Sequence, residues 1–330
     1  MGHVISNSSN IHKVMYEHLT TQAQKAMYAL KEKTKSTVGY LPAKLSIKMF
    51  DTYILPILEY NSEIWFREKQ IETLEKIQVR FLKNPLSVRC QTSTLAILAD
   101  TGRFPLIVRQ HASAIKFLGR LRSNTCPLLL RSCYDIQTKL HQRGVPCWLT
   151  RLYKVTETLG TDSDNSSINK HILSLFEKAH TKMLTEINDS TLNPKLRTYK
   201  TFKNDIRIEP YLNYTLPKSV YCNIARFRLS SHNLNIELGR HKRPYVPADE
   251  RICEKCNLNQ VEDEFHCLMR CKKWNDIRLN LFHIACKYIE GFTIFDPTEQ
   301  FLQILTTKNT NLNFALGKFL QVALKLDSKI

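Results

Sequence analysis

The residues with the clearest chemical potential are four cysteines and a histidine between positions 253 and 271. Cys253 and Cys256 form a Cys-x2-Cys pair, and nine residues further on the chain reads His266-Cys-Leu-Met-Arg-Cys271. A Cys-x2-Cys pair can chelate one ion from a tight turn, and a second pair just downstream can complete a tetrahedron. Because thiolate and imidazole donors together suit zinc best, the sequence predicts one bound Zn²⁺ per chain.

The spacing leaves the identity of one ligand open. Cys253, Cys256, His266 and Cys271 would give three thiolates and one imidazole, whereas Cys267 in place of His266 would give four thiolates. Cys267 and Cys271 are four residues apart and would share one face of a helix. We favour His266, because a His-x4-Cys spacing can close around an ion where a helix frays. With four protein ligands either site would be structural rather than catalytic.

The net charge favours a polyanionic partner. The chain has 48 Lys and Arg against 30 Asp and Glu, a formal charge of +18, and nucleic acid is the commonest partner for such an excess. The basic residues cluster within 101–150 and 195–243 and again beside the cysteines. The predicted nucleic-acid-binding residues are Arg109, Lys116, Arg120, Arg226, Arg228, Arg240, Lys242, Arg243, Lys272 and Lys273.

Each of these surface predictions has a plainer alternative. Arg109, Lys116 and Arg120 fall on one stripe of a helix expected to begin after Pro105, and such a stripe is either a solvated face or a phosphate contact. The aromatic side chains of Tyr245 and Trp274 could stack on an exposed base, or they could pack into the core. The residue types alone do not choose between these alternatives.

The elements that must position these residues are predicted to be helices. Nine Gly and twelve Pro among 330 residues are few for a turn-rich β architecture, so we expect an all-α fold. Apolar residues at spacings of three and four predict helices over 11–37, 70–83, 168–187, 194–206, 217–231, 262–273, 275–290, 298–307 and 311–326, with Pro85 ending the second of these. The polar stretch 160–167 is predicted to be a linker between domains.

Several phrases of the chain resemble a known family. Residues 50–65 (FDTYILPILEYNSEIW), 74–83 (LEKIQVRFLK), 102–106 (GRFPL) and 226–234 (RFRLSSHNL), together with the Cys/His cluster, resemble the region that follows the catalytic palm in non-LTR (LINE-type) retrotransposon reverse transcriptases. The resemblance implies a thumb-like helical region at 1–90, a basic helical connector at 91–160, and a C-terminal helical domain at 168–330. The zinc module would lie at about 250–275 in that last domain.

The resemblance also suggests a function without catalysis. The family's palm carries a Tyr-x-Asp-Asp turn, and Asp-Asp does not occur in this chain; the Arg/Lys-Pro-Asp signature of a restriction-like endonuclease is absent after Cys271. We therefore expect a nucleic-acid-binding C-terminal fragment that holds template RNA or target DNA beside the palm domain of a parent polymerase. The alternative is a zinc-stabilised helical module that binds proteins and not nucleic acid.

The expected compartment is nuclear or cytoplasmic. No stretch approaches 18 uninterrupted apolar residues, so we expect no membrane span. The cysteines outside the cluster are expected to be reduced thiols, because the sequence shows neither a secretory leader nor the small size of disulfide-rich secreted scaffolds.

Overall fold

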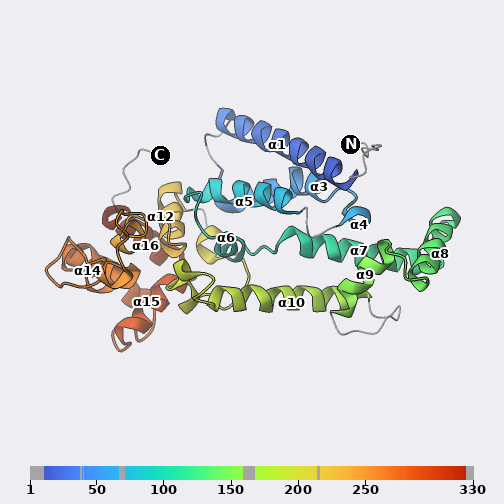
Figure 1. Cartoon of the computed structure of the whole chain (residues 1–330). Helices are drawn as coiled ribbons and strands as arrows, with labels where there is room; N and C mark the ends of the chain where they lie inside the picture. Colours follow the sequence, from blue (N-terminus) through green and yellow to red (C-terminus); the bar gives the residue numbers. More distant parts are fainter. Residues whose placement is uncertain are drawn as a thin grey trace. The chain divides into compact units, whose positions relative to one another are not determined.

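The computed structural model of the chain describes residues 11–37, 39, 41–66, 71–158, 168–213 and 216–324. Across these residues every regular element is a helix (Figure 1), and pairing of extended backbone is limited to two isolated bridges, Thr101 with Ile208 and Ile252 with Val261. The predicted all-α class is confirmed. The predicted linker at 160–167 lies outside the described residues.

The chain divides into two compact units, each assembled from three stretches of sequence. Unit 1 comprises residues 1–37, 49–78 and 104–183, and unit 2 comprises 38–48, 79–103 and 184–330. The division into consecutive regions at 1–90, 91–160 and 168–330 stays a prediction. Unit 1 contains α1 (Ile11–Thr37), α3 (Leu55–Leu58), α4 (Ser62–Trp65), α7 (Leu106–Arg122), α8 (Leu128–Gln142), α9 (Trp148–Glu157) and most of α10 (Ile168–Asn188).

Unit 2 holds the remaining helices, and two further helices run across the division. The remaining helices are α6 (Thr94–Asp100), α11 (Pro210–Asn213), α12 (Lys218–Arg228), α13 (Asn235–Leu238), α14 (Asn275–Tyr288), α15 (Pro297–Thr306) and α16 (Thr310–Ala323). The two that cross are α2 (Ala43–Tyr53) and α5 (Glu72–Leu86).

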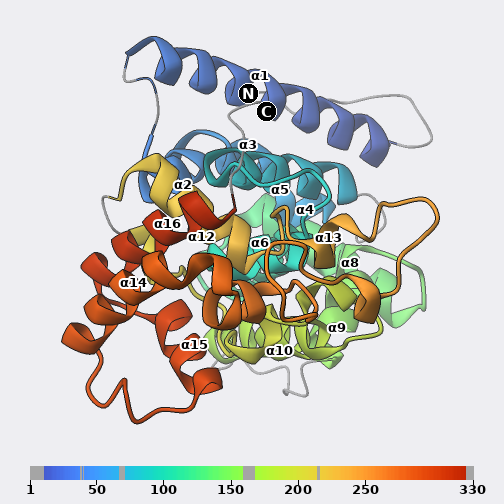
Figure 2. The ribbon, with the colours of Figure 1, turned by 90° about the vertical axis from the view of Figure 1, so that its left-hand side faces the viewer.

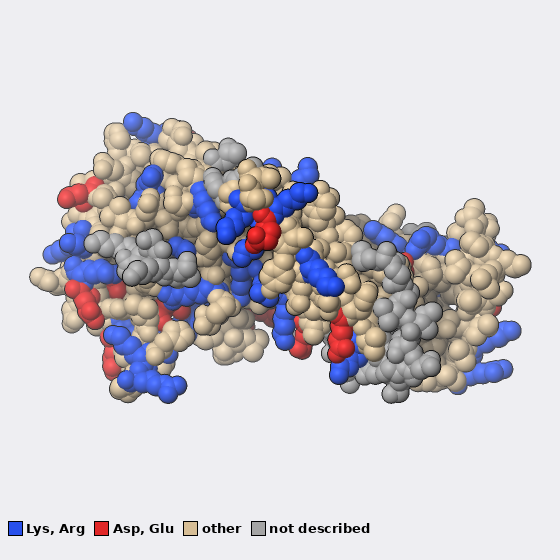
Figure 3. Space-filling model, turned by 90° about the horizontal axis from the view of Figure 1, so that it is seen from above, with Lys and Arg blue, Asp and Glu red and all other residues tan. Residues whose placement is uncertain are grey.

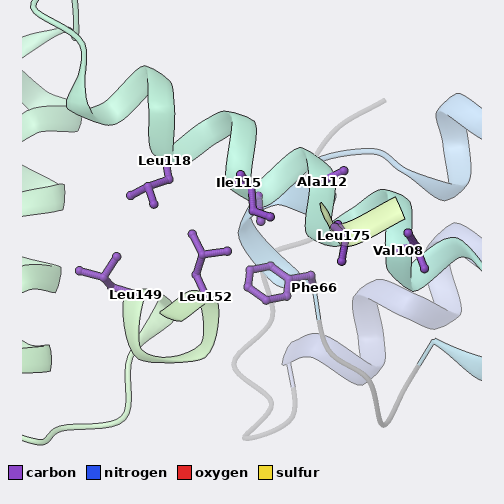
Figure 4. Close-up of a cluster of buried hydrophobic side chains, with 9 residues drawn as sticks. Phe66, Val108, Ala112, Ile115, Leu118, Leu149, Leu152 and Leu175 are labelled. Atoms are coloured by element: carbon purple, nitrogen blue, oxygen red, sulfur yellow. The ribbon is translucent and has the colours of Figure 1, made fainter. Parts of the chain in front are cut away.

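The core of unit 1 forms around one face of α7. Val108, Ala112, Ile115 and Leu118 recur at spacings of three and four, so they share that face. All four are buried, and they pack with Phe66 and with leucines of α9 and α10 (Figure 4). Removing such side chains from water stabilises the fold by roughly 1.5–3 kcal/mol each. The amphipathic pattern that predicted this helix is therefore the pattern that builds its core.

In unit 2, α16 packs against both α12 and α14 (Figures 1 and 2). The approach to α12 is close at Gly317, because a Cβ there would lie 2.4 Å from Val220 Cγ1 and 2.9 Å from the Val220 carbonyl oxygen. α16 starts at a capped end, where the Asn309 side chain accepts hydrogen bonds from the backbone N–H groups of Asn311 and Leu312. α16 is the central helix of this group, because it packs against both α12 and α14.

Three details differ from the helices expected from the sequence. The helix predicted over 194–206 is wrong; only two 3₁₀ turns form, Pro194–Leu196 and Tyr199–Thr201. Pro85 does not stop α5, which continues one residue beyond it to Leu86. The helix predicted over 262–273 is replaced by a π-helical turn at His266–Arg270 and a 3₁₀ turn.

A buried ionic centre explains why the stretch 194–206 departs from a helix. Asp100 Oδ1 lies 3.2 Å from Arg228 Nη2, and both side chains are at most 1% exposed. The hydroxyl of Tyr199 donates to Asp100 Oδ1 (2.9 Å) and that of Tyr211 to Oδ2 (2.7 Å). Burial alone would raise the pKa of Asp100, but Arg228 and Lys203 hold it below its ordinary value. Satisfying this carboxylate outweighs the helical preference of the segment.

Removing the Asp100 charge should destabilise the chain. Asp100→Asn leaves two buried cations, Arg228 and Lys203, sharing the single carboxylate of Glu209. One buried charge is then uncompensated, and we expect a loss of about 3–5 kcal/mol in the free energy of unfolding, measured in urea. The control is Asp205→Asn, which breaks the exposed ion pair with Arg207 and should cost less than about 1 kcal/mol. Equal losses in the two variants would contradict the assignment.

The same carboxylate should give the chain an acid-dependent stability. Because the pKa of Asp100 is lowered on folding, its contribution is fully present above its ordinary value of 3.8 and is lost as the pH falls below it. Urea unfolding of the wild-type chain at descending pH should show this loss. In Asp100→Asn the fall in stability should be smaller, and an unchanged acid profile would argue against a paired carboxylate.

Candidate metal centre

Four side chains of unit 2 converge as a set that could hold one metal ion. A single ligand atom from each of Cys253, Cys256, His266 and Cys271 lies within 4.8 Å of all the others. Cys253 Sγ is 3.9 Å from Cys271 Sγ, and Cys256 Sγ is 3.4 Å from His266 Nε2. A tetrahedron with metal–sulfur bonds of about 2.3 Å places its sulfurs about 3.8 Å apart. The observed spacing therefore suits a single tetrahedral ion.

The first two ligands are presented by a short closed loop. Ile252 and Val261 form an antiparallel bridge across its base, and the Cys253 N–H donates to the Gln260 carbonyl oxygen (2.9 Å). Asn259 has a φ of 49°, a left-handed conformation that Asn tolerates better than most residues and that lets the loop turn back. This local geometry keeps the pair of thiols at one end of the module.

A π-helical turn presents the other two ligands. The backbone N–H of Cys271 donates to the carbonyl oxygen of His266 (2.7 Å), a bond across five residues. A π turn brings residues five apart onto one face, whereas an α-helix does so for residues four apart. The turn therefore favours His266 over Cys267 as the partner of Cys271. Cys267 is buried outside the group of four ligand atoms.

The orientation of the His266 ring is set by its second nitrogen. Gln260 Oε1 lies 3.3 Å from His266 Nδ1, so it can accept a hydrogen bond from the Nδ1–H group. The Nε2 lone pair is then left to face the thiols. Burial lowers the pKa of His266, although Asp263 acts in the opposite direction. The ring is therefore neutral at pH 7, which is the form that can donate a lone pair to a metal.

The thiols of Cys253 and Cys271 hold their protons in the absence of a metal. Burial raises the pKa of Cys253 to about 12, and burial likewise raises the pKa of Cys271. A metal ion binds the thiolate, so its binding must release these protons. Affinity for a metal at this centre will consequently weaken as the pH falls.

The π-helical turn is anchored through a buried carboxylate two residues before His266. Both oxygens of Glu264 accept hydrogen bonds from Arg197 Nη2, at 2.9 and 2.8 Å, and Glu264 Oε1 lies 2.9 Å from His232 Nε2. Burial alone would raise the pKa of Glu264, but Arg197 and His232 hold it far below its usual range. A charge this deeply buried stays only with its partners in place, so the turn is fixed to the residues around α12.

The other side of the centre is fixed to α14. Arg278 is buried, and it donates through Nη2 to the carbonyl oxygen of Cys271 (2.5 Å) and through Nε to that of Leu268 (2.7 Å). These carbonyls end the π turn and would otherwise lack partners. Neither Arg278 nor Gln260 was identified as a site residue from the sequence, because neither belongs to a ligand pattern.

The ten predicted nucleic-acid-binding residues have different surroundings. Lys116, Arg120, Lys242, Arg243, Lys272 and Lys273 are exposed. Three others are half-buried and bound within the protein. Arg109 binds Glu59, and Arg226 binds the Ser87 carbonyl oxygen. Arg240 binds Glu237 and the Pro194 carbonyl oxygen. Arg228 is buried against Asp100 and is withdrawn from the predicted surface, because a phosphate cannot reach it.

Four exposed basic residues of unit 2 lie on the two segments that enter and leave the metal centre. Lys242 and Arg243 precede the first ligand, and Lys272 and Lys273 follow the last one directly. On the face shown in Figure 3, Lys and Arg outnumber Asp and Glu. These four side chains are therefore exposed to solvent on segments that adjoin the metal ligands in sequence.

The two aromatic residues beside the centre have different environments. Trp274 is only 8% exposed and packs into the core, while Tyr245 is 66% exposed. The guanidinium of Arg251 lies over the Tyr245 ring at 5.4 Å and donates through Nε and Nη2 to the Val246 carbonyl oxygen. Arg251 is itself buried, so its contacts with Tyr245 and Val246 attach this exposed segment to the interior. No motif in the sequence predicted this role.

Comparison of the chain with protein-family models, with curated proteins and with solved structures found no match. Among the described helices, none combines the length and the apolar character that a membrane crossing would need.

Metal binding should depend on His266 and not on Cys267. We expect one tightly bound metal ion per purified chain by elemental analysis, lost in His266→Ala and in Cys256→Ser because each removes one of four donors. Cys267→Ala is the matched control and should keep the ion. Retention of the metal by His266→Ala together with its loss from Cys267→Ala would reverse the ligand assignment.

Gln260 should act on the metal through His266. Gln260→Ala removes the acceptor that orients the ring, and we expect the metal affinity to fall by about 10–100-fold while the stoichiometry at saturating metal stays at one. Competition with a colorimetric chelator measures this change. Glu254→Ala, an exposed substitution between the two first ligands, should leave the affinity unchanged; a similar loss in both variants would indicate a general disturbance of the loop.

Proposed function

We propose that this chain binds nucleic acid through a basic surface built around a structural zinc site, and that it does so without catalysis. The observation that carries the proposal is the exposure of Lys242, Arg243, Lys272 and Lys273 on the segments that flank the four ligands. Lysine and arginine neutralise backbone phosphates and release the counterions condensed on them. A rigid frame beneath these side chains would lower the entropy lost on binding.

Zinc is the metal that the donor set supports best. Three thiolates and one imidazole in a tetrahedral arrangement are typical of structural zinc, and softer or harder ions prefer other donor sets. Four protein ligands leave no open position for a substrate or a water molecule, so the ion's role is architectural. Structural zinc sites contribute on the order of 10–16 kcal/mol of apparent binding free energy, enough to fix the flanking segments.

The segment before the first ligand offers both kinds of contact that a single strand needs. Lys242 and Arg243 can contact phosphates, and the exposed ring of Tyr245 can stack on an unpaired base. The buried Arg251 holds this segment through the Ile236 and Val246 carbonyl oxygens. Single-stranded RNA or DNA is therefore the class of ligand that this surface fits best.

We further propose that the chain corresponds to the C-terminal region of a non-LTR retrotransposon reverse transcriptase. The support is the set of phrases at 50–65, 74–83, 102–106 and 226–234 and the Cys/His cluster that follows them. In that setting the chain would hold template RNA or target DNA while a separate palm domain polymerises. Sequencing the coding region upstream of Met1 tests this: an in-frame Tyr-x-Asp-Asp turn supports the proposal, and an unrelated upstream sequence contradicts it.

The salt dependence of binding tests the proposed surface. We expect full-length chain to bind a fluorescent single-stranded RNA in anisotropy titrations, with an affinity that falls steeply with salt. Replacing Lys242, Arg243, Lys272 and Lys273 by Ala should reduce the slope of log affinity against log salt by about 3, since each phosphate contact on a single strand contributes about 0.7.

A control of equal charge makes the outcome specific. Lys25, Lys31, Lys33 and Lys35 are exposed on α1, and their replacement by Ala removes the same four charges from unit 1. We expect this variant to keep the wild-type slope. Equal slopes in wild type and in the variant at the metal centre would contradict the proposed surface, and the absence of any salt-dependent binding would favour a zinc-stabilised module that binds proteins.

A further inference from the structure

Helix α8 of unit 1 leaves its apolar side chains in solvent. It is 15 residues long and none of its residues is buried. Leu128 is 81% exposed, Leu129 76% and Ile136 56%. A surface helix of a globular domain normally turns such residues toward the core, so this exposure requires a different explanation.

Four apolar residues of α8 lie on a narrow stripe, and Leu128 and Leu130 lie to either side of its first residue. Leu129, Cys133, Ile136 and Leu140 follow one another at spacings of four, three and four, which is the spacing of the contact seam in a two-helix coiled coil. Leu129, Cys133 and Ile136 are exposed, and Leu140 is half-buried. The stripe thus has the width of a helix-packing seam rather than that of a broad apolar face.

Another face of α8 is held by polar contacts with α7 and α9. The hydroxyl of Tyr134 accepts from Arg122 Nε (3.2 Å), the Gln137 side chain accepts from the Trp148 N–H (3.0 Å), and His141 Nδ1 lies 3.1 Å from the Thr150 hydroxyl. The helix is therefore fixed in place without using its apolar seam. An exposed apolar seam on a helix that is held in place by other contacts can bind a partner without reorganising.

The charge around the seam indicates the chemistry of that partner. Arg131, Lys139 and Arg143 flank it, and Asp135 is the one carboxylate of α8. In Figure 3 the end of unit 1 formed by α8, on the right, is largely uncharged with Lys or Arg at its margin. Acidic side chains beside a complementary apolar seam would satisfy both features.

We propose that α8 is a docking site for an amphipathic helix of a protein partner, one with an apolar seam of heptad spacing and acidic flanking residues. A second copy of the chain would bring the same basic residues together and is disfavoured by repulsion. An anionic membrane favours a helix with a wider apolar face, and nucleic acid gains nothing from exposed leucines. The site is independent of the metal centre and of the proposed nucleic-acid surface.

Binding of defined peptides tests the site on the full-length chain. The probe is a fluorescent peptide of about four heptads with Leu at the seam and Glu at the flanking positions, compared with the same peptide carrying Lys in place of Glu. We expect the acidic peptide to bind and the basic one not to. Leu129→Ser with Ile136→Ser should weaken binding on the order of 100-fold, because two buried contacts are lost.

A matched pair of exposed apolar residues elsewhere provides the control. Leu173 on α10 is 63% exposed and Ile294 is 86% exposed, so Leu173→Ser with Ile294→Ser changes the same residue types and should leave the affinity unchanged. In addition, Lys139→Glu with Arg143→Glu should transfer the preference from the acidic peptide to the basic one. These outcomes together would support both the seam and its charge.

Four results would overturn the proposal. The first is equal binding of the acidic and basic peptides, and the second is failure of both to bind. The third is binding to phosphatidylserine vesicles that the α8 variant loses, with no binding of the acidic peptide. The fourth is concentration-dependent dimerisation in sedimentation that the same variant loses. The third would assign the seam to a membrane, and the fourth to a second copy of the chain.

Discussion

The pairing of one buried carboxylate, Glu264, is the constraint on which the metal centre depends. A carboxylate that is 1% exposed has to be matched by partners, because an unpaired charge in the interior would cost several kcal/mol. Arg197 and His232 provide that match from segments 67 and 32 residues away in sequence. The ligand His266 follows Glu264 by two residues, so satisfying the charge also places the imidazole beside the thiols. The fold of unit 2 thereby supplies a prearranged set of donors.

Unit 2 uses the same principle a second time at Asp100. This carboxylate connects the end of α6 with Arg228 of α12, with the Tyr199 hydroxyl from the irregular stretch 194–206 and with the Tyr211 hydroxyl of α11. Polar groups that are fully satisfied inside a protein specify one arrangement of the segments around them. Part of the arginine of unit 2 is therefore used in internal pairing, at Arg197 and Arg228.

The sequence predicted those features that depend on local pattern. Long amphipathic stretches such as 11–37 and 168–187 form helices at nearly the expected bounds, because one apolar stripe determines both the period and the buried face. The cluster of donor atoms matches the expected set with His266. Features set by distant partners could not be predicted: the interior position of Arg228, the contacts of Arg251, and the irregular path of 194–206. Nothing in the neighbourhood of Arg228 distinguishes it in sequence from an arginine that faces solvent.

The proposed roles belong to different parts of the chain. The metal centre and its basic flanks belong to unit 2, while the seam of α8 belongs to unit 1 and is held by polar contacts of α7 and α9. Each can therefore be altered without disturbing the residues that carry the other.

The most direct test of the central claim is the X-ray absorption spectrum at the zinc edge of the purified full-length chain. We expect one zinc ion with three sulfur neighbours at about 2.3 Å and one nitrogen neighbour at about 2.0 Å. A first shell of four sulfurs would replace His266 by Cys267 and contradict the role given to the π turn. Folded protein that contains no zinc, and takes none up, would contradict the metal centre itself.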